Sequence, residues 1–207
     1  MHLLTLIFGI VLLPKTYTLT CYQCVPGSSG TCTGTTKQCP LRAHQCRAAR
    51  ITSYIGDSKL ADVNIKTCAL DEQCLEGAVN FGITRTVITS KCCATDLCNS
   101  EPAAEPSLAR DNGLKCHRCD GQKCSTLNCK GNEDHCISAA VNLRGEKKIM
   151  KGCASEKMCS DTANAQIAGA IPGETSCCQG DFCNSASSKS AGLLLLVAPL
   201  FSLVMFS

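Results

Sequence analysis

The chain has 207 residues, of which 20 are cysteines, and a formal net charge of +3. A cysteine at about one position in ten is typical of secreted proteins, in which cysteines form disulfides because free thiols do not persist outside a reducing compartment. Basic and acidic residues are interspersed, without the polybasic stripe that binds phosphate backbones, so we expect no nucleic-acid partner.

The chain begins with an apolar run from Leu3 to Leu13, followed by Pro14 and the small-residue stretch Thr16 to Thr18. This run is shorter than the about 20 residues that a membrane-spanning helix needs. Its length and the small residues behind it are typical of a secretory signal peptide. We therefore predict that residues 1–18 are a signal peptide.

The cysteines form two sets of ten, and each set ends in the phrase Cys-Cys-x4-Cys-Asn. This repeat predicts one small module used twice, over residues 19–99 (the first copy) and 114–184 (the second copy). Residues 100–113 between them are polar and contain two prolines, which predicts an extended linker between separately folded units. The first set is Cys21, Cys24, Cys32, Cys39, Cys46, Cys68, Cys74, Cys92, Cys93 and Cys98. The second set is Cys116, Cys119, Cys124, Cys129, Cys136, Cys153, Cys159, Cys177, Cys178 and Cys183.

In the first copy, β-branched residues surround turn signals. Residues 47–55, the turn Gly56-Asp57-Ser58 and residues 60–67 predict a hairpin, and residues 79–89 predict another strand-rich arm. No stretch shows sustained helical periodicity, so we predict an all-β, disulfide-rich protein. A module of about 80 residues buries too little apolar surface to be stable alone, and disulfides at about 2–4 kcal/mol each are the expected substitute.

The second copy repeats this arrangement. Residues 137–143, a turn at 144–146 and residues 147–151 predict the matching hairpin, and residues 167–175 predict a further arm that Pro172-Gly173 interrupts.

The C-terminal residues have the pattern of a glycolipid-anchor signal. The stretch from Gly192 to Phe206 is apolar, has no basic residue behind it and follows a short spacer of small polar residues. A membrane-spanning helix would need about 20 apolar residues and basic residues on its cytoplasmic side. We predict that residues 185–207 direct anchoring, with Ser185 or Ser187 as the attachment residue and Asn184 as a further possibility.

The start of the first copy, Leu-Thr-Cys21-Tyr-Gln-Cys24, the ordered gaps and the closing Cys-Cys-x4-Cys-Asn resemble the lymphocyte-antigen-6/urokinase-receptor family. The resemblance implies two tandem three-finger modules, in which β loops project from a disulfide knot. Spacing alone allows roughly a thousand pairings for each copy. The bridges that the resemblance implies are Cys21–Cys46, Cys24–Cys32, Cys39–Cys68, Cys74–Cys92 and Cys93–Cys98, then Cys116–Cys136, Cys119–Cys124, Cys129–Cys153, Cys159–Cys177 and Cys178–Cys183.

The resemblance also implies that Asn99 and Asn184 brace the two knots by side-chain hydrogen bonds to the backbone. The two aspartates before the last cysteines, Asp96 and Asp181, are expected to accept local backbone hydrogen bonds in a turn. The stretches behind the double cysteines contain no histidine of the kind that activates water in secreted phospholipases, and we expect no enzymatic activity and no cofactor.

A zinc site is the rival interpretation of the Cys-x2-Cys spacing at Cys21–Cys24 and Cys116–Cys119. We favour disulfides, because the compartment is oxidising and every cysteine has a counterpart.

The remaining chemistry is recognition by the finger tips. Arg144, Lys147 and Lys148 crowd one hairpin of the second copy and could contact an acidic protein partner or a sulfated glycan. Lysines on exposed strands also prevent edge-to-edge association, which is the simpler explanation. In the first copy Tyr54 is one of very few aromatic side chains that could anchor a partner.

The sequence as a whole predicts a binding or receptor protein, anchored by glycolipid to the outer face of the plasma membrane, that recognises an extracellular protein. The urokinase receptor has three modules and this chain has two, so urokinase binding does not follow from the resemblance. The alternative is a soluble secreted inhibitor or modulator of an extracellular enzyme such as a phospholipase. A toxin-like ligand of ion-channel receptors fits single modules better.

Overall fold

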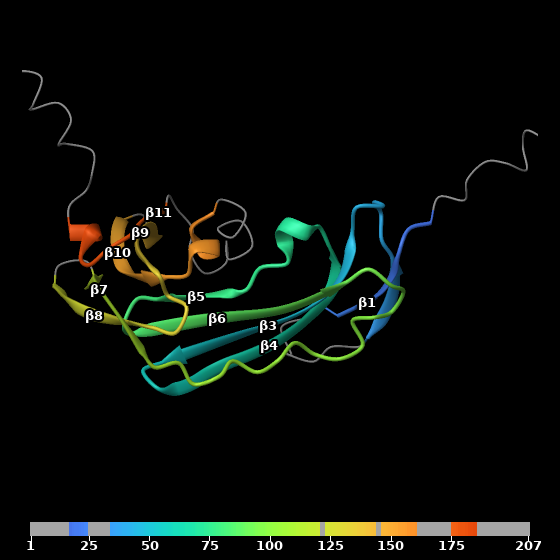
Figure 1. Cartoon of the computed structure of the whole chain (residues 1–207), viewed down its shortest axis with the longest axis horizontal. Coiled ribbons are helices and arrows are strands. Elements are labelled where there is room, and N and C mark those ends of the chain that lie inside the picture. The colour runs from blue at the N-terminus through green and yellow to red at the C-terminus, as the bar shows by residue number, and fades with distance from the viewer. Residues whose placement is uncertain (1–16, 25–33, 121–122, 144–145, 161–174, 186–207) are drawn as a thin grey trace, which may run out of the picture. The chain divides into compact units, whose positions relative to one another are not determined.

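The structure is a computed structural model that describes residues 17–24, 34–120, 123–143, 146–160 and 175–185 (Figure 1). Most of the predicted signal peptide and anchor signal lies outside these residues. Within them, no helix is both long and apolar enough to cross a membrane. The elements are β1 Thr20–Gln23, β2 Thr35–Gln38, β3 Gln45–Ile55, β4 Ser58–Ala69, η1 Asp71–Gln73, β5 Gly77–Asn80, β6 Thr84–Cys93, β7 Asp111–Asp120, β8 Cys124–Lys130, β9 His135–Leu143, β10 Glu146–Ala154, η2 Glu156–Cys159, β11 Thr175–Cys178 and η3 Cys183–Ser185.

All regular elements in the described part of the chain are strands or single 3-10 turns, which confirms the all-β prediction. The predicted hairpins are present as β3–β4 and β9–β10. The turn residues Arg144 and Gly145, and residues 161–174, which include most of the predicted last arm, lie outside the described residues.

The chain divides into two compact units, and their boundary differs from that of the two copies. The first unit consists of Met1–Ser53, Lys59–Glu76 and Ile88–Pro106, and the second of Tyr54–Ser58, Gly77–Val87 and Ser107–Ser207. The second unit therefore contains β5, the β5–β6 turn and the tip of the β3–β4 hairpin, all of which come from the first copy.

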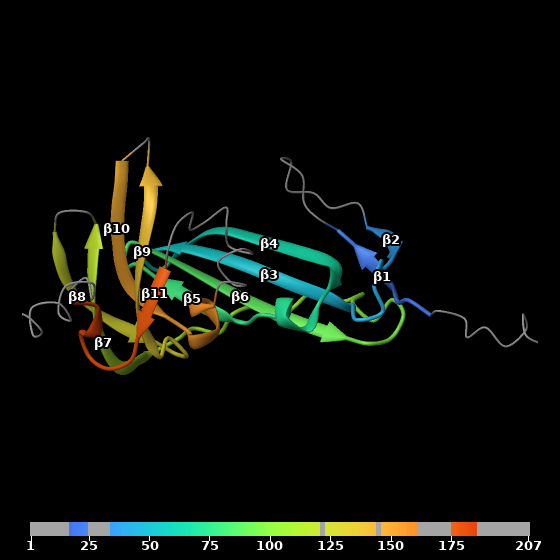
Figure 2. The ribbon, with the colours of Figure 1, turned by 90° about the horizontal axis from the view of Figure 1, so that it is seen from above.

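In the first unit, β1 pairs with β2 in an antiparallel ladder, and β3 lies between β4 and β6 (Figure 2). The core is small and consists largely of sulfur: Cys21, Cys39 and Cys46 are buried, with Leu19 packed against them. Burial of disulfides thus takes the place of a large apolar interior.

In the second unit, β9 lies between β11 and β10, β10 continues the sheet to β5, and β7 pairs with both β8 and β10. Its core repeats the sulfur cluster of the first unit, and Ile137 and Met158 are its largest buried apolar side chains.

Nine disulfide bonds join the cysteines that the structure describes in full, and their pairs are those that the resemblance implies. Cys24 is also bridged, but its expected partner Cys32 lies outside the described residues. The nine are Cys21–Cys46, Cys39–Cys68, Cys74–Cys92, Cys93–Cys98, Cys116–Cys136, Cys119–Cys124, Cys129–Cys153, Cys159–Cys177 and Cys178–Cys183.

Asn99 and Asn184 close the two copies in the same way. The Asn99 side chain accepts a hydrogen bond from the Tyr22 backbone N–H at 2.9 Å and donates to the carbonyls of Tyr22 and Arg47 at 2.9 and 3.0 Å. Asn184 makes the same exchange with the backbone of His117 at 2.9 Å. Both side chains are buried, so they satisfy backbone groups that water cannot reach.

The expectation of local hydrogen bonds for Asp96 and Asp181 is wrong. Asp96 Oδ1 accepts from the N–H of Thr20 at 2.8 Å, and Asp181 Oδ1 accepts from the N–H of Lys115 at 2.9 Å, across 76 and 66 residues of sequence. The next residue in each copy, Leu97 or Phe182, has a φ of 56°, a left-handed conformation that turns the chain back toward the first strand of its copy.

Residues 100–110 contain no strand or helix, and the last residues of the predicted linker belong to β7, which begins at Asp111. The Ala104 carbonyl accepts a hydrogen bond from Thr89 Oγ1 at 2.6 Å, and Lys66 donates to the carbonyl of Ser100. Backbone carbonyls that a proline-bearing stretch leaves unpaired are thus bound by side chains of the first unit.

Candidate binding surfaces

Of the four residues predicted to contact a partner, only Tyr54 and Lys148 have side chains in the described part of the structure. Arg144 lies outside the described residues, and only the backbone of Lys147 is described. Lys148 is exposed on β10, whereas Tyr54 is half-buried near the end of β3. These two strands are not neighbours in the sheet, because β5 and β6 stand between them in the strand order.

A different surface arises where β5 of the first copy meets β10 of the second. The two strands are antiparallel, with Asn80 opposite Cys153 and Val79 opposite Ala154. A Cβ atom on Gly152 would lie 2.0 Å from the carbonyl oxygen of Asn80, a distance that no side chain tolerates. Glycine at this position therefore permits the approach of the two backbones.

A buried carboxylate fixes the same junction. Glu133 has no exposed surface, and its Oε1 is 2.6 Å from Nε of Arg85. Its Oε2 accepts hydrogen bonds from Asn80 Nδ2 at 3.1 Å and from the Lys130 backbone N–H at 2.9 Å. Since a buried charge is costly unless it is paired, these contacts hold the β5–β6 arm on the body of the second unit.

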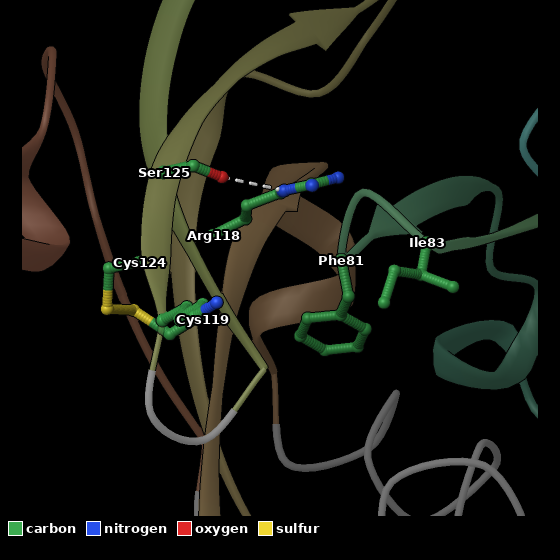
Figure 3. Close-up of a pocket in the computed structure, with 7 residues that line it drawn as sticks. Phe81, Ile83, Arg118, Cys119, Cys124 and Ser125 are labelled. Atoms are coloured by element: carbon green, nitrogen blue, oxygen red, sulfur yellow. Dashed lines mark hydrogen bonds between the residues drawn. A yellow bond between two sulfur atoms is a disulfide. The ribbon is translucent and has the colours of Figure 1, made fainter.

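Beside this junction lies an open pocket of about 400 Å³ (Figure 3). Phe81 and Ile83 reach it from the β5–β6 turn, while Arg118 projects from β7 toward them. Arg118 Nε donates to Ser125 Oγ of β8 at 2.8 Å. The remaining lining residues are Cys119, Lys123 and Cys124.

Gly82 stands between the two apolar residues of the pocket and has a φ of +85°. A Cβ atom there would lie 2.5 Å from Cδ of Arg118. Glycine is required here for two reasons: it adopts the left-handed backbone conformation of the turn, and it leaves room for the Arg118 side chain.

Sequence reasoning missed this pocket. The one sequence signal for the pocket was the short spacing of Cys119 and Cys124. Their disulfide closes a loop with a sequence separation of 5, compared with 8 between Cys24 and Cys32. That short loop holds Arg118 and Lys123 close together, but nothing local in the sequence brings Phe81 and Ile83 to them.

The first unit carries a separate cluster of paired charges. Arg50 binds Asp62 through two contacts of 2.7 and 2.5 Å, and Lys59 contacts both Asp62 and Glu105. The Arg50 hydrogen bond holds the pKa of Asp62 well below its usual range, and the hydrogen bond from Lys59 lowers the pKa of Glu105. The cluster binds the segment after the first copy to the β3–β4 hairpin.

Among the described residues, two groups of three cysteines have sulfurs that lie within 4.8 Å of one another inside each group, as ligands of a metal would. Each group joins two neighbouring disulfides, and the Sγ atoms of Cys21 and Cys39, like those of Cys116 and Cys129, are 3.3 Å apart. Sulfurs in disulfides lack the thiolate that binds zinc. The two groups are therefore van der Waals contacts in the cores.

The u-PAR/Ly-6 domain model matches residues 17–101 and 112–186. The chain is 26% identical over 159 residues to the urokinase plasminogen activator surface receptor of Bos taurus, which covers 72% of this chain and 48% of the receptor. It is 28% identical over 182 residues to the receptor of Mus musculus, covering 78% and 52%. The chain therefore spans about half the length of these receptors.

A second kind of relative is a gamma-type phospholipase A2 inhibitor of Elaphe quadrivirgata, which is 31% identical over 107 residues, 45% of this chain and 54% of the inhibitor. Among solved structures, mouse TEX101 aligns with 80% of this chain and 97% of its own, with 13% identity and a TM-score of 0.29.

Proposed function

The chain belongs to the u-PAR/Ly-6 domain family, and from this premise we propose that it is a binding protein of the cell surface, held by a glycolipid anchor, that recognises another extracellular protein. The observation that carries the proposal is the match of the family model to both halves of the chain. It is supported by the composition of the cores, which are built largely from cysteines and small side chains, so that larger apolar side chains on the arms stay exposed. Ile55, Leu60 and Ile149 on these arms are 48%, 64% and 43% exposed.

The second candidate is a soluble inhibitor of an extracellular enzyme. Similarity to the phospholipase A2 inhibitor favours it, because that relative shares 31% of residues over the matched segment. The two candidates share the mode of binding and differ in the presence of the anchor.

For the anchor we propose attachment at Ser187 rather than Ser185. The Ser185 N–H donates to the carbonyl of Phe182 at 2.9 Å, and its own carbonyl accepts from Lys151 Nζ at 3.1 Å. A residue tied into a closed 3-10 turn is a poor substrate for an enzyme that must cut the chain directly after it, whereas Ser187 follows the last residue of η3 by two positions in the sequence.

Treatment of expressing cells with a phosphatidylinositol-specific phospholipase C tests the proposal. The full chain, tagged behind Thr18, should leave the cell surface and appear in the medium. Ser187→Leu should abolish surface display, because the attachment site requires a small residue. The matched change Ser185→Leu should reduce it less. Secretion of untreated protein into the medium, without surface display, would favour the soluble inhibitor.

We propose a partner contact for Arg144, Lys147 and Lys148 that is separate from Tyr54, and charge reversal tests it. Replacing Lys147 and Lys148 by Glu should abolish binding to cells that carry an acidic partner. The binding of the parent protein to the same cells should weaken as the salt concentration rises. The exposed Lys157 in η2 provides the control. Equal binding by both variants would show that the charges only protect the strand edge.

A further inference from the structure

We propose that the pocket between the β5–β6 turn and the β7–β8 hairpin is the docking site for an acidic side chain next to an aromatic or aliphatic one, on an extended segment of an extracellular protein. This inference rests on the proposed binding function and names the chemistry of the partner.

The charge of the pocket selects an anion. Arg118 and Lys123 both line it, and no Asp or Glu is among the described residues that do so. Ser125 accepts one hydrogen bond from the Arg118 guanidinium, which carries five N–H donors in a rigid fork. A carboxylate can therefore bind the remaining donors side by side, while the exposed Lys123 adds a second positive charge.

The apolar part of the lining selects a peptide rather than a sulfated sugar. Ile83 is 53% exposed, and Phe81 lies beside it facing the pocket (Figure 3). The carbonyl of Ile83 accepts a hydrogen bond from the N–H of Gly56 at 3.1 Å, which places the exposed Ile55 on the adjoining surface. A sugar chain coated with sulfates gains little from such surface, whereas an apolar side chain buries it.

The pocket is also held in shape before any partner arrives. The disulfide Cys119–Cys124 closes the β7–β8 end, and the buried contact between Arg85 and Glu133 fixes the arm that carries Phe81 and Ile83. A rigid site loses less entropy when it binds, so a short peptide can bind measurably. Because one wall comes from the first copy and the other from the second, a single copy has only half of the site.

The test is fluorescence polarisation with the full chain purified from mammalian cells. The probe is a fluorescein-labelled octapeptide that contains Asp-Phe-Asp, and the matched probes contain Asn-Phe-Asn or Asp-Ser-Asp. The first should bind about tenfold more tightly than either control, because each control removes one of the two kinds of contact. Its affinity should fall as salt rises.

Two variants connect this binding to the pocket. Arg118→Gln should weaken the first probe about tenfold, and Lys123→Gln, at an exposed position where folding is not at stake, should weaken it severalfold. Lys157→Gln should leave it unchanged. No binding up to about 1 mM, equal binding of the three probes, or insensitivity to both pocket variants would overturn the inference.

Preferential binding of a heparin oligosaccharide at the same residues would also overturn it. None of these outcomes bears on the proposed cell-surface function, which phospholipase release and the reversal of Lys147 and Lys148 test separately.

Discussion

Glu133→Ala should destabilise the second unit strongly. The side chain is fully buried, and its two oxygens receive the Arg85 guanidinium, the Asn80 amide and the Lys130 backbone N–H. Alanine removes both oxygens and leaves all three donors without this acceptor. Arg85, whose side chain is 15% exposed, would then keep its charge without a partner.

The size of the effect follows from this arrangement. Breaking one side of a buried ion pair costs about 3–5 kcal/mol, because the other charge stays buried. For a chain of this size each kcal/mol lowers the unfolding midpoint by about 2–4 °C, which predicts a fall of roughly 6–20 °C. Glu133→Gln keeps an oxygen acceptor but loses the charge, and should cost about half as much.

Thermal unfolding of the purified full chain, followed by circular dichroism without reductant, measures these differences. Glu156→Ala is the matched control, because Glu156 is exposed in the same unit and should change the midpoint by less than about 2 °C. The double variant with Arg85→Met should recover part of the loss, since no unpaired charge remains. If Glu133→Ala costs no more than Glu156→Ala, the carboxylate does not hold the junction and the reasoning fails.

Three other changes test the remaining contacts. Gly152→Ala should open the β5–β10 pairing, because its Cβ would lie 2.0 Å from the carbonyl oxygen of Asn80. Amide hydrogen exchange should therefore become faster in both strands. The control Gly34→Ala, whose Cβ would meet no atom within 4 Å, should leave the exchange rates unchanged. Asn99→Ala removes three hydrogen bonds to the backbone and should lower the free energy of unfolding by about 2–4 kcal/mol, so both the unfolding midpoint and secretion should fall; unchanged secretion would contradict its bracing role. Because the pKa of Asp62 is lowered in the folded protein, its contribution to stability is complete at a pH above the usual carboxylate pKa and is lost as the pH falls through the lowered pKa. The unfolding midpoint should therefore fall in acid, and Asp62→Asn should make the midpoint depend less on pH.

The parts of the fold that the sequence predicted are those that local patterns and cysteine order determine. The hairpin expected at residues 47–67 is present as β3 and β4, since β-branched runs around Gly56-Asp57-Ser58 act within one stretch of chain. The short strands β1, β2 and β8 were not predicted. They have four to seven residues and too few apolar side chains to show alternation.

The long-range parts could not be predicted for a physical reason. Alternation along a strand says which face is buried but not which other strand its edge will meet. Gly152 and Asn80 give no sign in the sequence that they touch, and neither do Phe81 and Arg118. The predicted contact residues were chosen by charge and aromaticity alone, and such a choice cannot find a pocket whose walls lie about 40 residues apart in the chain.

The seam at β5 and β10 also bears on how such a protein can be divided or recombined. A gene fragment that begins inside the linker would yield a second half in which β10 keeps β9 and β7 but lacks β5, and an open strand edge of this kind invites pairing with other molecules. Exchange of halves between relatives would succeed only where the incoming pieces bring both a glycine for the close approach and an acid for the arginine. The two copies therefore share one cysteine pattern, but the residues that join β5 to β10 fit each copy only to its own partner.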